Sequence, residues 1–539
     1  MHLRPSASGG SGRAALNGRD DVLSTSDLTR RAAGSTVGSM IAARAKLAPN
    51  KIAIESKAGT LTYGQLDDRA NRLASHLASL GVDRGERIAI LSENRAEYLE
   101  VHLAAAKLGA IVACQNWRLA PPELDHCISL VAPRVMLMSP RHAGLLATVE
   151  YKEATGITFG SEYEAALAAA DPSPVERDVD PEDGLFILYT SGTTGLPKGA
   201  IVSHRAEFAR ALLRGYEFAI PLGPTAATWM PFYHMSGTDD AIGALLGGGK
   251  VIVLDGFDAA ELAELVGRES IAWLRLMPGM IGCLADELRA RKIKPKPMQL
   301  CGTMADLVPR HQIAEITTLL QAPFVNSFGA TETGLAPCSS GIIPIGEVPT
   351  DLGKTQTSFC ELRLLDADGN EVADGQPGEA AVRGPTLFSG YWNAPEANQR
   401  DFRGGWFHMG DMFSRRPDRK LDFVDRSKYM IKSGGENIYP AEIERVLLKE
   451  TRVSDAVVVR RRDDKWGEVP VAFVARKDDT LTRDELVSLC RKQLAGFKQP
   501  KEILFVPFEK LPRSTTGKIQ RHEIEKWIED ESLADVVTA

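Results

Sequence analysis

Short apolar runs alternate with helical stretches along most of the chain, from about residue 35 to residue 425. Residues 87–91 read as a strand, and the stretch behind them carries Leu99, Leu103 and Ala106 at helical spacing. The same alternation recurs as a strand at 251–254, a helix at 259–266 and a strand at 271–277. Units of this length favour parallel sheets covered by helices. We therefore predict an α/β fold whose large N-terminal domain contains helix-covered mixed or parallel sheets.

The pattern changes after residue 425. Pro440 stands in the first turn of a predicted helix, and strands are predicted at 456–459 and 469–474. Residues 482–485 form a capping box ahead of a helix that runs to Leu494, and a strand near 503–506 and a terminal helix follow. This order indicates a small, mobile α+β C-terminal domain. The charged stretch 425–428 suits a hinge, so we predict three parts: a disordered tail (1–34), a large domain (35–427) and a C-terminal lid (428–539).

Composition narrows the class of protein. The net charge of −7 argues against a nucleic-acid binder, which usually carries a basic excess. No apolar run has the roughly 18 residues that a membrane span needs. The seven cysteines are scattered without a C-x-x-C pair, as expected of reduced thiols in a cytoplasmic protein. The first 19 residues contain three arginines and no acidic residue, which fits a plain tail or an organelle-targeting segment.

Residues 189–200, YTSGTTGLPKGA, suggest phosphate binding. They follow a buried-strand pattern at 185–189, and a glycine-rich turn with hydroxyls and one lysine makes a concave anion site. The stretch is not a nucleotide-triphosphatase P-loop, because Pro197 precedes Lys198 and Gly199 takes the place of the magnesium-binding hydroxyl. The sequence predicts a phosphate loop of another kind.

Five further motifs follow in order: MPFYHMSG at 230–237, NSFGATETG at 326–334, GWFHMGD at 405–411, DRSKYMIKSGGENIYP at 425–440 and PRSTTGK at 512–518. With these motifs the chain resembles, over nearly everything after residue 35, the adenylate-forming superfamily of acyl-CoA synthetases, luciferases and adenylation domains. That family attacks the α-phosphate of ATP with a carboxylate, and a thiol then displaces AMP from the acyl-adenylate. The resemblance implies ATP, Mg²⁺ and coenzyme A, with a small-molecule fatty or aromatic carboxylic acid as substrate.

The resemblance also implies roles for residues at the nucleotide. Glu332 is the expected Mg²⁺ ligand, with Thr331 on the α-phosphate. Asp411 is expected to accept the ribose hydroxyls, and Arg426 to bind ribose or phosphate. The residues expected to bind the β- and γ-phosphates are Thr190, Ser191, Gly192, Thr193, Thr194 and Lys198. Those expected around adenine are Gly302, Thr303, Phe328 and Gly329.

Lys518 is the residue that the resemblance assigns to the first half-reaction, because an ammonium can bridge the incoming carboxylate and the α-phosphate. The family rotates its small domain afterwards, about a pivot that Lys428 matches here. The rotation brings Lys432, Gly434 and Gly435 to the pantetheine channel. The expected catalytic set is Lys518, His234, Lys198, Glu332 and Arg426.

His234 matches the family's gate at the acyl pocket. The expected pocket wall consists of His234, Met235, Ser236, Gly237, Asp239, Met277 and Met280, and its methionines suggest an apolar, adaptable site. Asp239 and Asp240 are unusual in such a wall. Either one of them is solvated, or one pairs with Arg275 or meets a hydroxyl of the substrate.

Three alternative functions share these motifs. A stand-alone adenylation enzyme that loads a carrier protein normally has Asp directly after the gate, where this chain has Met235. A luciferase-like oxidation of the acyl-adenylate would want a more aromatic pocket. A catalytically dead nucleotide sensor would be expected to lack Lys518 or Glu332, and both are present.

Overall fold

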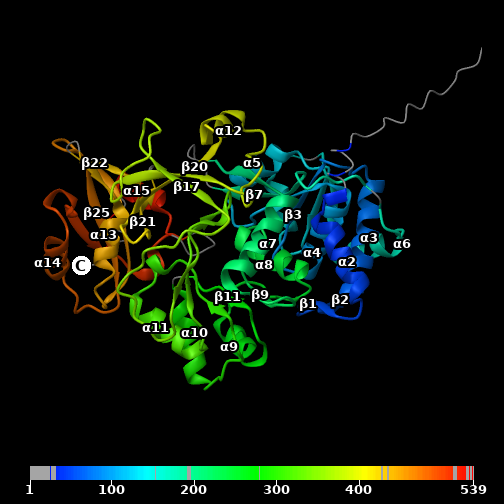
Figure 1. The fold of residues 1–539 in the computed structure, drawn as a ribbon, viewed down its shortest axis with the longest axis horizontal. Coiled ribbons are helices and arrows are strands. Elements are labelled where there is room, and N and C mark those ends of the chain that lie inside the picture. Colours follow the sequence, from blue (N-terminus) through cyan, green and yellow to red (C-terminus); the bar gives the residue numbers. More distant parts are fainter. Residues whose placement is uncertain are drawn as a thin grey trace, which may run out of the picture. The chain divides into compact units, whose positions relative to one another are not determined.

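The computed structural model describes residues 25, 29, 32–151, 153–175, 177–190, 196–277, 279–426, 429–433, 436–513, 519–529, 533 and 537. Residues 36–539 separate from residues 1–35 as a unit of their own, and the fold given below is that of this larger unit. It has the mixed α/β character that the sequence predicts (Figure 1).

A six-stranded sheet forms the first part of the N-terminal domain. Its strand order is β6-β5-β3-β4-β7-β8, parallel except for the antiparallel pair β7–β8. The strands are β3 (Arg87–Leu91), β4 (Ile111–Cys114), β5 (Val135–Met138), β6 (Thr155–Thr158), β7 (Gly184–Thr190) and β8 (Lys198–Ser203). Its helices are α2 (Val37–Leu47), α3 (Tyr63–Ser79), α4 (Ala96–Leu108), α5 (Pro121–Val131) and α6 (Ser161–Ala169), with a 3₁₀ turn at Ala143–Thr148.

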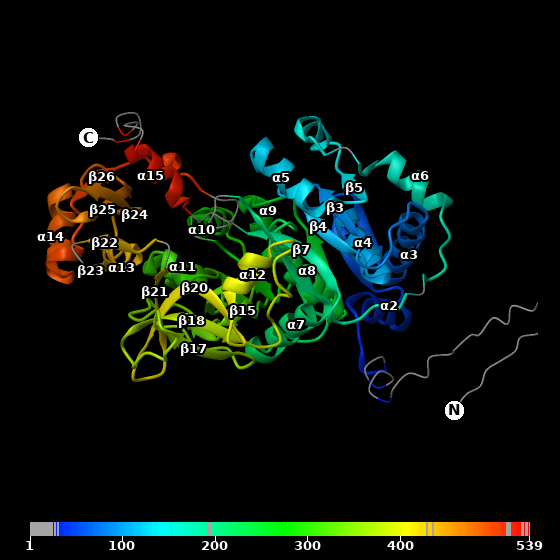
Figure 2. The ribbon, with the colours of Figure 1, turned by 90° about the horizontal axis from the view of Figure 1, so that it is seen from above.

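Alternation along β3 explains why both faces of this sheet are covered. Ile88 and Ile90 pack into a core with α3 and α4, whereas Ala89 and Leu91 pack into a separate core with α5. Figure 2 shows α5 on the opposite side of β3 from α3. Since neither face meets water, the central strands are continuously apolar, as parallel strands in α/β proteins usually are.

Two four-stranded sheets complete the centre of the domain. In the first, of order β2-β1-β10-β9, β10 is parallel to both β1 and β9. In the second, of order β11-β12-β13-β16, only β16 runs antiparallel. The strands are β1 (Ile52–Ser56), β2 (Gly59–Thr62), β9 (Thr225–Thr228), β10 (Lys250–Val253), β11 (Trp273–Leu274), β12 (Leu300–Cys301), β13 (Phe324–Asn326) and β16 (Gly341–Ile343). The helices are α7 (His204–Phe218), α8 (Met235–Leu246), α9 (Ala259–Arg268), α10 (Met280–Ala290) and α11 (Arg310–Leu320), with a 3₁₀ turn at Ala305–Leu307.

An antiparallel sheet of order β17-β18-β20-β19, with β21 also paired to β20, closes the N-terminal domain. A two-stranded ribbon, β14 with β15, precedes it in the chain. The elements are β14 (Gly329–Ala330), β15 (Gly334–Pro337), β17 (Glu361–Leu365), β18 (Pro377–Arg383), α12 (Pro395–Asp401), β19 (Phe402–Arg403), β20 (Trp406–Arg415) and β21 (Leu421–Arg426).

The C-terminal domain, orange to red in Figure 1, is built on a sheet of order β23-β22-β25-β24, with β26 parallel to β25. Val458 on β24 faces a core with α13 and α14, and Val457 and Val459 face a core with α15. Figure 2 shows α13 and α15 on opposite sides of this sheet. The elements are β22 (Ile431–Ser433), β23 (Glu436–Ile438), α13 (Pro440–Leu447), β24 (Val453–Asp463), β25 (Gly467–Arg476), α14 (Arg483–Gln493), a 3₁₀ turn (Gly496–Lys498), β26 (Glu502–Phe505), a 3₁₀ turn (Phe508–Lys510) and α15 (Arg521–Glu529).

Most predicted elements are present, with one strand much shorter than expected. The run 271–277 was predicted as a strand, but only Trp273–Leu274 pairs as β11. The next residue, Arg275, accepts a hydrogen bond at its carbonyl from the Trp229 indole N–H (2.9 Å). Among the described residues, no helix has the length and apolar character to cross a membrane.

Candidate active site

The strand pair β7–β8 brings Thr190 and Lys198 opposite each other, at the two ends of the predicted phosphate loop. The loop residues Ser191, Gly192, Thr193 and Thr194 lie outside the described residues. The Thr190 hydroxyl is buried and makes no hydrogen bond to any residue that the structure describes. Because a buried hydroxyl usually has a partner, this one fits a site for a ligand oxygen.

Lys198 sits among three groups that can hold a cation. Its Nζ lies 3.4 Å from Asp401 Oδ2 on α12 and 3.7 Å from the ring centre of Tyr391. Burial lowers the pKa of Lys198, and the nearby Asp401 and Glu332 carboxylates oppose that shift. Both side chains of the Lys198–Asp401 pair keep some exposure, 17% and 16%. The ammonium therefore remains within reach of an incoming anion.

Glu332 and Lys198 are joined through one tyrosine. The Tyr391 hydroxyl donates to Glu332 Oε1 (2.9 Å), while the face of its ring lies under the Lys198 ammonium. The backbone around Tyr391 pairs with β8, because Trp392 N–H donates to the Gly199 carbonyl and Ile201 N–H donates to the Gly390 carbonyl. Tyr391 is therefore fixed to the strand that carries Lys198.

Small and aromatic residues surround the predicted adenine slot. Gly302 has φ +72°, and a Cβ there would come within 2.0 Å of the Phe324 ring, so this position requires glycine. The Thr303 hydroxyl lies 2.5 Å from Ser327 Oγ. Phe328 is partly buried and meets the Phe413 ring edge-on at 4.8 Å, so its ring is held in one orientation.

The β14–β15 ribbon carries Gly329 and leads into Thr331 and Glu332. The Thr331 carbonyl accepts a hydrogen bond from Arg210 Nη2 (2.8 Å), which ties this loop to α7.

Asp411 and Arg426 are cross-strand partners on β20 and β21. Arg426 Nε donates to Asp411 Oδ1 at 3.0 Å, and Asp411 is 1% exposed whereas the Arg426 side chain is 40% exposed. The Asp411 charge raises the pKa of Arg426, and Glu332 contributes to the same shift. Glu332 is therefore within electrostatic reach of both Lys198 and Arg426.

His234 is the N-cap of α8, and its Nδ1 accepts a hydrogen bond from the Ser236 N–H (3.2 Å). Gly237 lies under the preceding turn, where a Cβ would come within 2.4 Å of the Pro231 carbonyl oxygen. This close approach sets the direction in which the helix leaves the gate motif.

The predicted methionines come from two separate cores. Met235 packs against the core of the first two sheets, whereas Met277 and Met280 belong to the core around α9, α10 and α11. The predicted pocket residues therefore come from two different hydrophobic cores.

Ionisable side chains from α7, from α8 and from the residue after β11 form a group that we call the buried network: Glu207, Arg210, Arg214, Asp239, Asp240 and Arg275. Arg275 forms two hydrogen bonds with Asp240 (2.7 and 2.9 Å), and Arg214 pairs with the same carboxylate (2.7 Å). Of the alternatives for the two aspartates, the structure shows Asp240 paired with Arg275. Burial acts to raise the pKa of Asp240, but the two arginines hold it below its ordinary value.

Asp239, a predicted pocket residue, is 5% exposed and lies 3.5 Å from Arg210 Nη1. Burial raises the pKa of Glu207 well above its ordinary value, and the adjacent Asp239 carboxylate adds to that rise. Arg210 connects Asp239 to the Thr331 carbonyl.

In the C-terminal domain, Lys432 lies exposed on β22, and its backbone N–H donates to Glu468 Oε2 (2.9 Å). Lys428, Gly434, Gly435 and Lys518 lie outside the described residues, as does Pro278 beside the pocket methionines.

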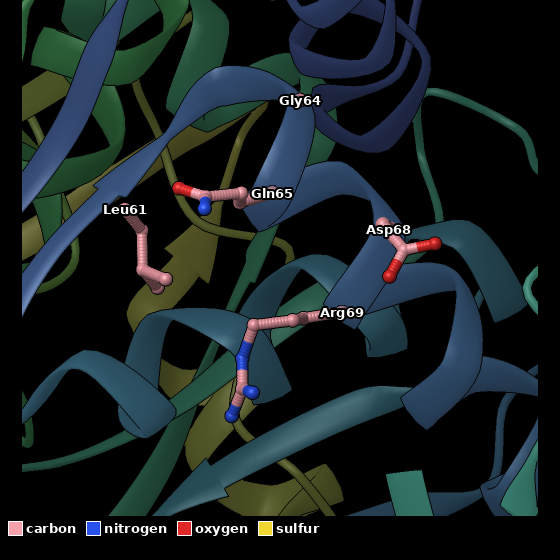
Figure 3. Close-up of a pocket in the computed structure, with 5 residues that line it drawn as sticks. All are labelled: Leu61, Gly64, Gln65, Asp68 and Arg69. Carbon is pink, nitrogen blue, oxygen red and sulfur yellow. The ribbon is translucent and has the colours of Figure 1, made fainter. Parts of the chain in front are cut away.

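A surface cavity of about 360 Å³ lies away from all these residues. Leu61, Gly64, Gln65, Asp68 and Arg69, from β2 and α3, line it (Figure 3). Arg69 is already paired with Glu100 and Glu164. None of the predicted site residues takes part, so this cavity is not the candidate site.

Sequence reasoning missed Tyr391 and Asp401. Both follow the phosphate loop by about two hundred residues, and only the pairing of the Tyr391 segment with β8 brings them to Lys198. The sequence offered one signal, a Gly-Tyr-Trp run at 390–392 followed by a helix that begins with Pro395.

Comparison with known proteins shows the family of the chain. Residues 41–392 match the family of AMP-binding enzymes, and residues 442–518 match the AMP-binding enzyme C-terminal domain. The chain is 33% identical to a feruloyl-CoA synthase of Amycolatopsis, over 91% of this chain and 98% of that protein. It is 32% identical to an indoleacetate–CoA ligase of Aromatoleum aromaticum, over 90% and 96% of the two chains.

Among solved structures, the o-succinylbenzoate CoA synthetase of Bacillus subtilis has a similar fold. In complex with its acyl-adenylate intermediate it gives a TM-score of 0.78 at 26% identity, over 90% of this chain and 97% of that chain. In complex with ATP and magnesium it gives 0.78 at 25% identity, over 90% and 98%.

These relatives favour the CoA ligase over the carrier-loading and luciferase-like alternatives. The chain therefore belongs to the AMP-binding enzyme family, and it is an AMP-forming acid–thiol ligase that uses ATP, Mg²⁺ and CoA to make an acyl-adenylate and then a CoA thioester.

Proposed function

We propose that the acid is aromatic, an aryl-alkanoic or aryl-alkenoic acid in preference to a fatty acid. The observation that carries this proposal is that two relatives of more than 30% identity, aligned over at least 90% of this chain, are named for feruloyl and indoleacetate substrates. The partly apolar stretch Met235–Gly237 and the methionines at 277 and 280 fit a flat ring between two walls.

In this proposal the first half-reaction uses the polar residues around Tyr391. Lys198 and Thr190, together with Ser191, Gly192, Thr193 and Thr194, hold the β- and γ-phosphates and release them as pyrophosphate. Phe328 stacks on adenine between Gly302, Thr303 and Gly329. Asp411 accepts the ribose hydroxyls, Arg426 binds ribose or phosphate, and Thr331 contacts the α-phosphate.

Glu332 is the proposed Mg²⁺ ligand, and its surroundings fit that role. One carboxylate oxygen accepts from Tyr391, which leaves the other available, and Mg²⁺ commonly takes one carboxylate with phosphate and water oxygens. Bound there, the ion neutralises phosphate charge as the carboxylate approaches. Within the described part of the chain no three His, Cys, Asp or Glu residues cluster as a metal cage, which agrees with a metal that arrives with ATP.

His234, with Met235, Ser236, Gly237, Asp239, Met277 and Met280, forms the proposed acyl pocket. Asp239 lies beside Arg210, so in this proposal it contributes to the pocket only by a hydrogen bond with a polar group of the acid. Lys432, Gly434 and Gly435 serve the second half-reaction, at the pantetheine thiol. We propose that the enzyme acts in the cytoplasm, a reducing compartment in which its seven cysteines would stay free, as they are in the structure. The proposed domains are 35–427 and 428–539, after a tail of 1–34.

Lys518 bridges the incoming carboxylate and the α-phosphate in this proposal. Lys518→Ala should then abolish acyl-adenylate formation while CoA transfer to a supplied acyl-adenylate continues. Equal loss of both half-reactions would contradict the assignment.

The substrate proposal is tested with a panel of acids, ATP, Mg²⁺ and CoA, reading thioester formation by mass spectrometry. The panel compares four aryl acids (ferulate, indoleacetate, benzoate and 2-succinylbenzoate) with two fatty acids (octanoate and palmitate). We expect kcat/KM for one of the aryl acids to exceed both fatty acids by at least about tenfold, since one poorly filled pocket contributes a factor of that order. A fatty acid as the best substrate would overturn the proposal.

A further inference from the structure

The Lys198 ammonium has a carboxylate partner that none of the six motifs contains. Asp401, the last residue of α12, lies 3.4 Å from Lys198 Nζ. It is also bound by its neighbour Arg400, whose Nε and Nη2 donate to the two carboxylate oxygens (2.7 and 2.9 Å). The charged groups that face Lys198 are therefore Asp401, Arg400 and Glu332, with the ring of Tyr391 beneath it.

The helix that carries Asp401 is anchored to the strand that carries Lys198. Asn398 on α12 accepts a hydrogen bond from the Tyr391 N–H (2.7 Å) and donates to the Tyr391 carbonyl (2.9 Å). Tyr391 in turn forms a bridge with Ala200 of β8. Asp401 is thus kept beside Lys198 by the fold and does not depend on a loose side-chain encounter.

We propose that Asp401 is the resting counter-ion of Lys198, which the terminal phosphates of ATP displace on binding and which recaptures the ammonium as pyrophosphate leaves. This inference rests on the proposed contact of Lys198 with the β- and γ-phosphates. A lysine without a resting partner would hold pyrophosphate more tightly, and release of that product would slow. Asp401 therefore lowers affinity for the leaving group in order to speed turnover.

The exposure of the pair sets the expected size of the effect. Both side chains are about one-sixth exposed, 17% for Lys198 and 16% for Asp401, so the pair is weaker than a fully buried one. Its removal should strengthen pyrophosphate binding by about three- to tenfold. AMP lacks the β- and γ-phosphates, so its affinity should not change.

The experiment measures the dissociation constants of Mg²⁺-pyrophosphate and of AMP by calorimetry on the full-length enzyme, without acid or CoA. Asp401→Asn should tighten pyrophosphate about three- to tenfold and leave AMP unchanged, and Asp401→Glu should behave like the wild type. The matched control is Glu396→Gln, which removes the same charge from the first turn of the same helix. It should change neither constant. Unchanged or weaker pyrophosphate binding in Asp401→Asn, or an equal shift for AMP, would overturn the inference.

Lys198→Gln separates this inference from the proposed function. If Lys198→Gln leaves pyrophosphate affinity unchanged, the phosphate contact itself is wrong, and the role of Asp401 is overturned with it. If Lys198→Gln weakens pyrophosphate binding but Asp401→Asn does not tighten it, only the role of Asp401 is overturned. In the double variant, Asp401→Asn should have less than about a twofold effect, because it acts through Lys198. A full effect there would overturn the counter-ion role.

Discussion

Two groups of ionisable side chains in the N-terminal domain differ in their burial and in how they pair with opposite charges. In the buried network, Asp240 is held by two arginines with side-chain exposures of 6% and 9%. In the open cluster, which we define as Lys198, Glu332, Asp401, Asp411 and Arg426, the two cations keep partial exposure, 17% for the Lys198 side chain and 40% for the Arg426 side chain. The first group connects helices, and the second can exchange its partners for a substrate.

The difference shows that charge alone does not mark a site. Asp239 and Asp240 are next to the gate motif, yet both carboxylate oxygens of Asp240 accept hydrogen bonds from Arg275 in the buried network. Lys198 and Arg426 keep partial exposure, which lets them meet anions without a large desolvation cost. Substitutions in the network should therefore change stability, and substitutions in the open cluster should change catalysis.

The largest expected effect is on stability, from Asp240→Asn. This change leaves Arg275 and Arg214 buried without their counter-charge, and we expect the free energy of unfolding to fall by about 3–5 kcal/mol. Urea unfolding followed by circular dichroism measures it. The control is Asp255→Asn, which breaks a pair with Arg141 whose side chains are 34% and 54% exposed, and which should cost less than about 1 kcal/mol. Similar losses in the two variants would erase the distinction between the groups.

Glu332→Gln should have its effect on the reaction. Loss of the Mg²⁺-binding charge is expected to slow acid-dependent pyrophosphate release by about 10²- to 10³-fold, while the unfolding midpoint stays within experimental error of the wild type. Stopped-flow detection of pyrophosphate, beside a thermal scan, gives both numbers. A variant that loses stability but retains the rate would place Glu332 with the structural charges.

Acid should act on the buried polar groups through stability. His204, the first residue of α7, is fully buried, and its Nδ1 accepts a hydrogen bond from the Val37 N–H (3.2 Å). Burial lowers the pKa of His204 from 6.5 to about 4 in the folded protein. The unfolded chain therefore binds the proton first, so stability is intact above pH 6.5 and falls as the pH drops toward 4.

We expect protonation of this histidine to lower the free energy of unfolding by about 2–3 kcal/mol between pH 6.5 and pH 4. Urea unfolding at three pH values in that range measures the loss. His204→Asn keeps an acceptor for the Val37 N–H and carries no titrating group, so its pH slope should be smaller than that of the wild type. An unchanged slope would contradict the assignment to His204.

The smallest predicted effect comes from Tyr391→Phe, which keeps the ring under Lys198 and removes the hydroxyl that donates to Glu332. A hydrogen bond to a charged group is worth about 1.5 kcal/mol, so the KM for Mg²⁺ should rise roughly tenfold. The ATP affinity measured at saturating Mg²⁺ should change much less. An equal change in both would mean that the tyrosine acts on Lys198 and not on the carboxylate.

Local patterns predicted the elements well, and long-range pairing explains what they missed. The Thr482–Glu485 capping box and the strand 87–91 are present as predicted, because each depends on neighbours in the chain. The strand predicted at 271–277 is limited to Trp273–Leu274, and the Arg275 carbonyl after it accepts a hydrogen bond from Trp229, a long-range contact that no local pattern encodes. Asp401 was missed for the same reason, since it reaches Lys198 only through the pairing of 389–392 with β8.

For the candidate site residues, the sequence could not choose among their partners. The pair Asp239–Asp240 had three open interpretations, and the choice for Asp240 depended on Arg275 at the end of β11. The roles of Lys198, Glu332, Asp411 and Arg426 stay predictions, although the structure brings these residues into electrostatic contact.

The ligase should form an acyl-adenylate before the thiol takes part. Exchange of labelled pyrophosphate into ATP, measured with ferulate and Mg²⁺ in the absence of CoA, tests it most directly. We predict exchange that depends on the acid, requires no CoA and disappears in Glu332→Gln. Exchange that needs CoA, or release of ADP and phosphate instead of AMP and pyrophosphate, would contradict this order of steps.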